Sequence, residues 1–409
     1  MRARLCTHPS PRPLRLRVNT KFLWAFWAFW ALCVPRALHA QTGRELAGVP
    51  ALNYDADEGF GYGVILQLYD YGPGLSPYRY MVEPQVFLTT GGRQELSLFF
   101  DAPHVVRGWR MDAYLARIRQ VAWPYYGIGN GVVYEKALVT DANPYYYRFD
   151  GTRTQLRLNV QHPLARSLRV LLGGGLASVS VRPVPKDSGT TLLALQLGSR
   201  IPAAQADGGM SNYLRAGVVY DTRDREIGPG YGAWGEFLVQ RVDRALGSDW
   251  SYTRVTASWR SYHTLLPQLV FAGRLYLQDV LGDAPFYDLS IVESSFRQDE
   301  GLGGAKTVRG VLKDRYIGKA MAMANLELRW RATDFDFAGR DFHVILSTFL
   351  DAGRVWADGF RQGGLLSDLH PGYGGGVRLG MGESFIVALD VGHSAEAAAP
   401  VYIGLGYLY

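Results

Sequence analysis

The histidines are the side chains that could most readily bind a metal ion, but their spacing does not suit such a site. After residue 40, no pair has the separation that would place two ligands on one strand; the six are His104, His162, His263, His343, His370 and His393. Cysteine ligands are excluded there, because both cysteines, Cys6 and Cys33, lie in the first forty residues. We therefore predict no metal ion and no other cofactor.

A catalytic nucleophile is equally hard to find. His393 and Ser394, near Asp390, form the one local group with the residue types of a hydrolase triad. Adjacent residues of a strand point to opposite faces, however, so His393 and Ser394 would not face one substrate. The glycine-rich stretches 127–131 and 372–376 do not lie between a buried strand and a helix, as phosphate-binding loops do. The chain is therefore predicted not to be an enzyme.

The positive charge is confined to the start of the chain. The formal net charge is +6, with 43 basic and 37 acidic residues. Residues 1–40 contain seven of the basic residues and no acidic one, which leaves 36 basic against 37 acidic residues in the remainder. A nearly neutral chain without a basic patch is not expected to bind nucleic acid.

The first forty residues have the organisation of a secretory signal. A basic stretch up to Lys21 precedes the apolar run 22–34, and the segment ends on the small residue Ala40. Thirteen apolar residues are fewer than the roughly 20 that a membrane-spanning helix needs. We therefore expect residues 1–40 to be a cleaved signal peptide and residues 41–409 to form a single domain.

Alternation of apolar and polar residues predicts β-strands along that domain. Leu156 and Leu158 alternate with Arg157 and Asn159, which gives the strand one apolar and one polar face. The 48 glycines and 25 tyrosines also favour a β-rich protein. Sixteen strands are predicted, over residues 49–54, 59–69, 79–89, 93–101, 109–120, 145–161, 167–181, 210–221, 231–241, 251–262, 268–279, 317–331, 341–352, 372–381, 384–393 and 401–409.

These strands suit a membrane barrel better than a soluble sandwich. Long charged side chains occupy the polar faces of successive strands, as expected for a wet lumen, and aromatic residues gather near strand ends, as expected at membrane interfaces. The long connections 121–144, 182–209, 280–316 and 353–371 alternate with mostly short ones. An all-β, antiparallel transmembrane barrel of about sixteen strands is predicted, in the outer membrane of a Gram-negative bacterium, with long loops outside and both termini in the periplasm.

One triplet and two later acidic residues carry the most specific signal. Val308, Arg309 and Gly310 lie in the long loop before the twelfth predicted strand, Glu327 lies on that strand, and Asp351 lies on the next within the motif Phe349-Leu350-Asp351-Ala352-Gly353. This pattern resembles the BamA/TamA superfamily of outer-membrane barrels, which contains assembly factors, two-partner secretion translocators and bacterial surface antigens. In that family the arginine lies on an extracellular loop that folds into the lumen, where it is held by the glutamate and the aspartate.

The resemblance implies that Arg309 holds residues 280–316 inside the lumen by pairing with Glu327 and Asp351. The strand pattern agrees, because Glu327 shares a face with Asn325 and Arg329 while Leu326 and Leu328 face the other way. A guanidinium between two carboxylates forms charge-assisted hydrogen bonds, and the loss of one partner would leave a costly unpaired charge.

Two further segments resemble the same family. Asp221, Arg223 and Asp224, followed by glycines and proline at 228–230, are similar to its periplasmic hairpin. The C-terminal residues Tyr402, Gly404, Tyr407 and Tyr409 resemble the signal that directs barrels to the barrel assembly machinery. Two departures are evident: Val311 replaces the usual aromatic residue, and the periplasmic POTRA modules that receive client chains are not expected here.

The resemblance implies a barrel that assists protein insertion, translocation or membrane remodelling, with a periplasmic or outer-membrane partner replacing the POTRA modules and with outer-membrane lipids and lipopolysaccharide around it. The first predicted strand is short and contains Pro50, and the last contains Gly404 and Gly406, so we expect a weak junction that could open to the bilayer. Two alternatives remain open: a channel for small polar solutes and a passive surface antigen.

Overall fold

The computed structural model describes residues 43–409 apart from 56–57, 76, 183–188, 338, 361–363 and 382–384. The predicted signal peptide, residues 1–40, lies outside this range. The long strands are β1 (Gly43–Asp55), β2 (Gly59–Tyr71), β3 (Tyr80–Thr89), β4 (Arg93–Val106), β5 (Trp109–Pro124), β6 (Arg148–Ala165), β7 (Leu168–Arg182), β9 (Tyr213–Asp221), β10 (Gly232–Val242), β11 (Ser251–Leu266), β12 (Leu269–Asp283), β15 (Ala320–Phe337), β16 (Arg340–Trp356), β17 (His370–Met381), β18 (Phe385–His393) and β19 (Val401–Leu405).

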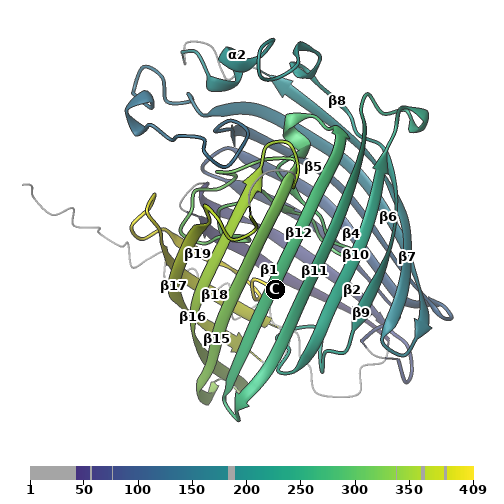
Figure 1. The fold of residues 1–409 in the computed structure, drawn as a ribbon. Coiled ribbons are helices and arrows are strands. Elements are labelled where there is room, and N and C mark those ends of the chain that lie inside the picture. Colours follow the sequence, from purple (N-terminus) through teal and green to yellow (C-terminus); the bar gives the residue numbers. More distant parts are fainter. Residues whose placement is uncertain are drawn as a thin grey trace, which may run out of the picture.

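These strands form one closed antiparallel sheet within the described part of the chain (Figure 1). Each long strand pairs with its neighbour in the sequence, and β1 pairs with β19 to complete the cylinder. Three short strands are added: β8 (Gly208–Met210) pairs with β7, and β13 (Ile291–Val292) pairs with β14 (Asp299–Glu300). The predicted all-β, sixteen-stranded antiparallel barrel is confirmed, because each predicted strand overlaps one long strand.

The helical segments are short and lie in the connections between strands. They are η1 (Lys136–Leu138), α2 (Leu192–Gln196), η2 (Ala203–Gln205), η3 (Arg244–Leu246) and η4 (Phe286–Asp288). In the part of the chain that the structure describes, no helix has the length and apolarity needed to cross a membrane.

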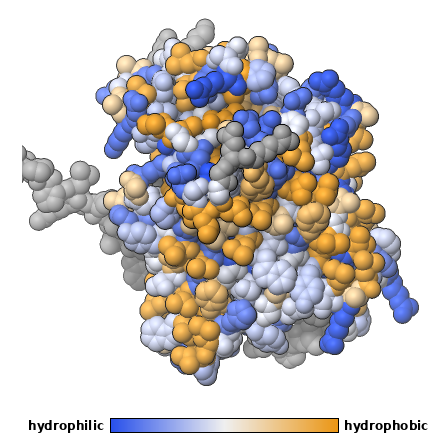
Figure 2. All heavy atoms as spheres, in the orientation of Figure 1, coloured by the Kyte–Doolittle hydropathy of each residue, from blue (hydrophilic) through white to orange (hydrophobic). Residues whose placement is uncertain are grey.

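The barrel has its polar residues inside and its apolar residues outside. On β15, Glu327 and Arg329 are 1% and 4% exposed, whereas Leu328 is 42% exposed. Figure 2 shows broad apolar areas along the outer face of the strands. A soluble sandwich would bury Leu328 and the other apolar residues of this face. The observed arrangement, with polar residues inside and apolar residues outside, is that of a barrel surrounded by lipid.

Long and short connections lie at opposite ends of the barrel. The connections 125–147, 183–212, 284–319 and 357–369 all leave the end at which α2 and β8 lie (Figure 1). Gly43 and Leu405 lie at the other end, with the turns 107–108, 166–167 and 267–268. An aromatic cluster at the long-loop end, including Trp123, Phe149 and Phe286, packs the strand ends against the long connections.

The first and last predicted strands need correction. β1 begins at Gly43 rather than at residue 49 and is 13 residues long, because Gly43–Gly48 continue the antiparallel ladder along Leu66–Tyr71. β19 ends at Leu405 rather than at residue 409. Gly406 has a φ of +80°, which turns the chain out of the extended conformation.

The seam between β1 and β19 is short in the described part of the chain. Among the described residues, two pairs join these strands, Tyr54 with Ile403 and Asp55 with Tyr402, compared with thirteen pairs between β1 and β2. The expected weakness of this junction does not arise from a short β1. β19 pairs with β18 as far as Leu405, whereas its described pairs with β1 are at Tyr402 and Ile403. Pro50 is paired with Val64 of β2.

A charge on the outer face should destabilise this barrel strongly. Leu275 lies near the middle of β12 and is 59% exposed. We expect Leu275→Arg to lower the free energy of unfolding in lipid by about 2–4 kcal/mol, because the guanidinium would lie near the bilayer midplane. Urea unfolding in lipid vesicles, followed by tryptophan fluorescence, measures the change.

Leu366, which is 84% exposed in the connection between β16 and β17, provides the control. Leu366→Arg should change stability by less than about 0.5 kcal/mol. Equal effects of the two substitutions would contradict a lipid-facing position for Leu275.

Candidate functional site

The connection between β12 and β15, residues 284–319, contacts strands from around the whole sheet. Near its start, Arg153 of β6 donates to Asp288 Oδ1 at 2.9 Å, and Arg215 of β9 donates to Glu293 Oε1 at 2.8 Å. Further along, Arg93 of β4 donates to Glu300 Oε2 at 3.0 Å. These arginines are on the polar faces of their strands, so much of the polar inner surface is paired with one connecting segment.

Arg309 is almost fully buried, with 1% of its surface exposed, and is hydrogen-bonded on two sides. Its Nε and Nη2 atoms donate to the two oxygens of Asp351 at 2.8 and 3.0 Å, and its backbone N–H donates to Oδ2 at 3.1 Å. Its Nη1 atom donates to Oδ2 of Asp390, on β18, at 3.2 Å. Glu327 Oε1 is 3.8 Å from Nη1, within ion-pair range but without a hydrogen bond.

The structure thus brings Arg309, Glu327 and Asp351 together, and it adds two residues that sequence reasoning did not assign to this site. Asp390 fills the second hydrogen-bonding position, and Arg378 of β17 joins Glu327 at 2.7 Å to Asp390 at 3.1 Å. The alternation of β18, with Val387, Leu389 and Val391 on its apolar face, places Asp390 on the inner face and could have indicated it.

The three named residues of the Phe-x-Asp-x-Gly motif are two positions apart, so a β-strand places them on the same face. Phe349, Asp351 and Gly353 share the inner face of β16. The guanidinium carbon of Arg309 lies 3.5 Å from the centroid of the Phe349 ring, which adds a cation–π contact to the Asp351 hydrogen bonds. At Gly353, a Cβ atom would lie 2.5 Å from Leu302 Cδ1, so the glycine leaves room for the segment. All three positions therefore face residues 302–309.

Gly310 allows the backbone of the triplet to lie against the backbone of β18. Its φ is +101°, and a Cβ atom there would lie 2.6 Å from the carbonyl oxygen of His393. Gly392 is close in the same way, since its Cβ would lie 2.7 Å from the nitrogen of Gly310. Val308 and Val311 are both buried, in an apolar cluster with Leu302. The triplet is thus fixed by charge, backbone and apolar contacts together.

The electrostatics of the site keep Arg309 charged. Burial would lower the pKa of its guanidinium, but Asp351, Glu327 and Asp390 more than reverse this effect and raise that pKa above its ordinary value. Three arginines, including Arg329, whose Nη2 is 3.0 Å from Glu327, neutralise three acids in this cluster. The arrangement can hold a segment in place, and it offers no free nucleophile.

The residues considered for catalysis are not arranged for it. The Ser394 hydroxyl donates to the carbonyl of Gly310 at 2.7 Å, and His393 Nδ1 lies 2.7 Å from the carbonyl of Ala398. Ser394 and His393 are therefore bonded to different backbone groups. Among the described residues, no group of three or more histidine, cysteine or acidic side chains could hold a metal ion.

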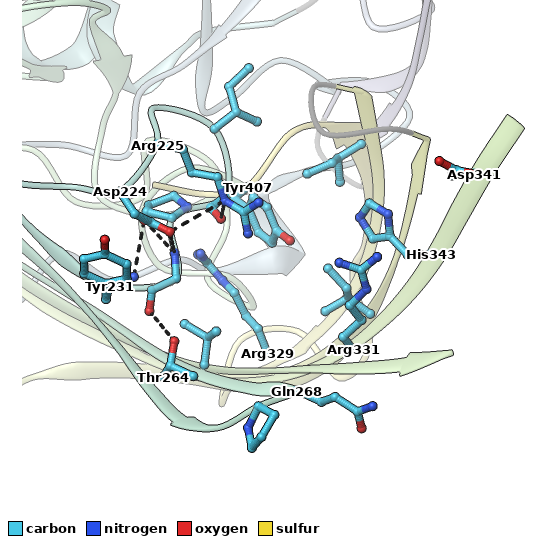
Figure 3. Close-up of a pocket in the computed structure, with 18 residues that line it drawn as sticks. Asp224, Arg225, Tyr231, Thr264, Gln268, Arg329, Arg331, Asp341, His343 and Tyr407 are labelled. Atoms are coloured by element: carbon cyan, nitrogen blue, oxygen red, sulfur yellow. Dashed lines mark hydrogen bonds and ion pairs between the residues drawn. The ribbon is translucent and has the colours of Figure 1, made fainter. Parts of the chain in front are cut away.

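The predicted hairpin residues form a capped turn at the end opposite the long loops. Arg223 Nε and Nη2 donate to the two oxygens of Asp221 at 2.9 and 3.0 Å, and Asp224 Oδ1 accepts from the backbone of Gly230 at 3.0 Å. The turn lines a cavity of about 410 Å³. Figure 3 shows Arg329 and Tyr407 on its wall, beside Asp224.

The C-terminal residues turn into the barrel after β19. The Tyr409 hydroxyl donates to the carbonyl of Ala272 at 3.0 Å, and the guanidinium of Arg329 lies 4.1 Å from the ring of Tyr407. The Tyr402 hydroxyl oxygen accepts from the Gly310 N–H at 3.2 Å, whereas Gly404 leaves open space. Tyr402, Tyr407 and Tyr409 therefore contact the inner residues, and Gly404 does not.

Comparison with known proteins identifies the family. A family model described as the Omp85 superfamily domain matches residues 89–388. A search of curated proteins finds no match. Among solved structures, BamA from Haemophilus ducreyi lacking POTRA domains 1–3 is similar, with a TM-score of 0.55 and 14% identity over 90% of this chain and 70% of that chain.

Two further solved structures are CdiB proteins. CdiB from Escherichia coli has a TM-score of 0.58 and 14% identity over 90% of this chain, and CdiB from Acinetobacter baumannii has a TM-score of 0.50 and 14% identity over 91%. The chain spans 63% and 61% of those two proteins. At this identity the likeness concerns the barrel fold.

Removal of the Arg309 side chain should destabilise the barrel. Arg309→Ala would leave Asp351 buried without its guanidinium partner, and we expect a loss of about 3–5 kcal/mol in the free energy of unfolding. Arg297→Ala is the matched control, because Arg297 lies in the same segment but its side chain is 59% exposed. Its expected cost is under about 1 kcal/mol. Equal losses of unfolding free energy in the two variants, measured by urea unfolding, would contradict a stabilising role of the buried Arg309 contacts.

Gly310→Ala should displace the triplet without removing a charge. The positive φ and the close His393 carbonyl oxygen make a Cβ atom unfavourable, at an expected cost of about 1–3 kcal/mol. Added trypsin should then cleave the segment faster at Lys306 and Lys313. Gly364→Ala, where a Cβ would meet open space, should leave cleavage unchanged. An unaltered cleavage rate in Gly310→Ala would contradict a tightly packed triplet.

Proposed function

Because the chain belongs to the Omp85 superfamily of outer-membrane β-barrels, we propose that it assists the insertion or translocation of other polypeptides, or remodels the membrane, by opening sideways between β1 and β19. The membership predicted from the Val308–Gly310 triplet and the Phe349–Gly353 motif is confirmed at the level of the superfamily. The observation that carries the proposal is the contrast between a two-pair seam and a segment held by buried charges.

Residues 284–319 fill the lumen in this proposal. Their partners include Arg93 on β4 and Asp351 on β16, strands that are far apart in the order of the closed sheet. A segment bonded to both must cross the space that the sheet encloses. A blocked lumen leaves the seam as the route between the interior and the bilayer.

The inner arginines also bear on the alternative of a channel for small polar solutes. Arg153, Arg215 and Arg254 would attract anions if they faced open water, but each is hydrogen-bonded to residues 284–319. Desolvation and pairing remove most of their attraction for solutes. The contacts therefore favour a closed barrel over a standing pore. A passive surface antigen would need neither the weak seam nor the buried network.

The cellular setting of the proposal follows the family. The chain would lose residues 1–40 as a signal peptide, and residues 41–409 would form one domain with both termini in the periplasm. The barrel assembly machinery would insert it, and outer-membrane lipids and lipopolysaccharide would surround its apolar face. A periplasmic or outer-membrane protein would deliver client chains to the seam.

Locking the seam tests the proposal. Cysteines at Tyr54 and Ile403, which are directly paired, would form a disulfide across it, and both natural cysteines lie in residues 1–40. In liposomes, we expect oxidation to stop the assisted insertion of a small reporter barrel and a reductant to restore it. Cysteines at the β15–β16 pair Leu328 and Thr348 are the control, and their oxidation should change nothing.

Planar-bilayer recording separates the alternatives. The native barrel should show low, flickering conductance that rises in Arg309→Ala but not in Arg297→Ala. A large, steady conductance in the native barrel would favour the channel. Insertion at the full rate with the seam locked would overturn the proposed function.

A further inference from the structure

Two short connections border the seam between β1 and β19. The β1–β2 turn contains Glu58, and the β18–β19 connection contains Glu396. The two pairs of the seam, Tyr54 with Ile403 and Asp55 with Tyr402, lie at the same end of the barrel as these connections. Any tie between Glu58 and Glu396 would therefore span the seam.

Residues 310–316, which we name the clasp, make that tie. Lys313 Nζ is paired with Oε1 of Glu58 and is 2.7 Å from Glu300. Two residues later, Arg315 Nε donates to Glu396 Oε1 at 2.9 Å. The clasp thus has a basic side chain on each side of the seam.

Both ion pairs are partly shielded from solvent, which strengthens them. The side chains of Lys313 and Glu58 are 12% and 11% exposed, and those of Arg315 and Glu396 are 3% and 19% exposed. The Tyr316 hydroxyl also donates to Glu396 Oε1 at 2.8 Å. Partly desolvated pairs of this kind hold more strongly than ion pairs in open solvent.

The clasp is fixed to the last strands at its start as well. The Gly310 N–H donates to the Tyr402 hydroxyl oxygen on β19, and the Gly310 carbonyl accepts from Ser394. The contact between Lys313 and Glu58 is therefore the point where this fixed segment reaches across to the first hairpin.

Asp314 lies between the two basic residues and is poorly accommodated. It is 1% exposed, and among the described residues neither of its carboxylate oxygens has a hydrogen-bond partner. Its φ of +50° is in the left-handed region. A buried carboxylate without donors is unfavourable when ionised and much less so when protonated.

We propose that residues 310–316 hold the seam shut, with Lys313 and Arg315 tying the β1–β2 turn to the β18–β19 connection, and that ionisation of Asp314 loosens this tie. Lys313 and Arg315 are positioning residues for the opening of the seam. The inference rests on the proposed function only in taking the seam as the part that opens.

The groups around Asp314 give the tie its pH dependence. Burial and the charges of Glu300 and Glu58 raise the pKa of Asp314 to about 7, although Lys313 and Arg93 act in the opposite direction. Lys313 and Arg93 lower the pKa of Glu58 and of Glu300 below the ordinary value in spite of burial, so both stay ionised near neutrality.

The sign of the effect follows from the raised pKa of Asp314. An acid whose pKa is higher in the folded state stabilises that state at low pH, and this contribution is lost as the pH rises through the raised value. The clasp should therefore hold more tightly at about pH 6 than at about pH 8.

Spin labels across the seam measure its closure without thiol chemistry during the assay. Nitroxides on Tyr54→Cys and Ile403→Cys lie on paired residues and should broaden each other's EPR spectra in lipid vesicles. Lys313→Glu should abolish the broadening, and Lys313→Glu combined with Glu58→Lys should restore it. Arg315→Glu, alone and combined with Glu396→Arg, should behave in the same way. Labels on Leu328→Cys and Thr348→Cys report whether the rest of the sheet stays paired.

Unchanged seam broadening in both charge reversals would overturn the proposal, and so would swaps that restore nothing while the control labels remain broadened. Should a reversal also abolish the control broadening, the barrel has unfolded, and the milder Glu58→Gln then decides. Loss of seam broadening in Glu58→Gln supports the tie, and full broadening refutes it.

The pH dependence is tested with Asp314→Asn, because asparagine removes the charge and tolerates the left-handed backbone conformation. Native seam broadening should decrease from about pH 6 to about pH 8, whereas in Asp314→Asn it should stay at the low-pH level. A native pH response that persists in Asp314→Asn would overturn the role of Asp314. A seam that responds to charge while client insertion is unaffected by the disulfide lock would uphold the clasp and reject the proposed function.

Discussion

A barrel in lipid must pair nearly all of its backbone hydrogen-bonding groups with its own strands, because the hydrocarbon offers none. Among the described residues of the barrel, the shortest ladder between two long strands is that of β1 and β19. The described ladder there has two residue pairs and reaches Ile403, although β19 continues to Leu405 beside β18 before Gly406 turns the chain. Side-chain contacts of residues 310–316 lie beside this short ladder, so the closure of the sheet depends on the position of these residues.

The inner network satisfies a second constraint, which is that buried charges need partners. The bidentate contact of Arg309 with Asp351 fixes the orientation of the guanidinium, and a lysine could not reproduce it. Asp390 and Glu327 then share Arg378 as well as Arg309. Departure of the segment would remove the Arg309 guanidinium from Asp351 on β16, whereas Glu327 and Asp390 would each lose one ion pair and keep Arg378. Burial below 2% of Arg309 makes the cost of this departure large.

The sequence predicted the strands well because the alternation of apolar and polar residues is a local signal. One face of each strand contacts lipid and the other contacts polar groups, so the alternation is maintained along the strand. It also predicted that Arg309, Glu327 and Asp351 would meet, through the family motif. It could not rank Asp390 above Glu327 as a hydrogen-bond partner, because that depends on distances of 3.2 and 3.8 Å across three strands. The end of β19 was missed because Tyr407 and Tyr409 keep the alternation of a strand while packing against Arg329 and Ala272.

The two sets of contacts on the segment differ in strength, and this difference decides what can move first. Arg309 is paired with carboxylates that are 0–11% exposed, whereas the partners of Lys313 and Arg315 are 11–25% exposed. Water can replace the more exposed partners at a smaller desolvation cost. Because only three residues separate Arg309 from Lys313, a force that parts the hairpins is carried directly to the clasp. In the proposed opening, separation of the seam should therefore break the Lys313 and Arg315 contacts while Arg309 remains bound to Asp351, so the segment stays attached to β16.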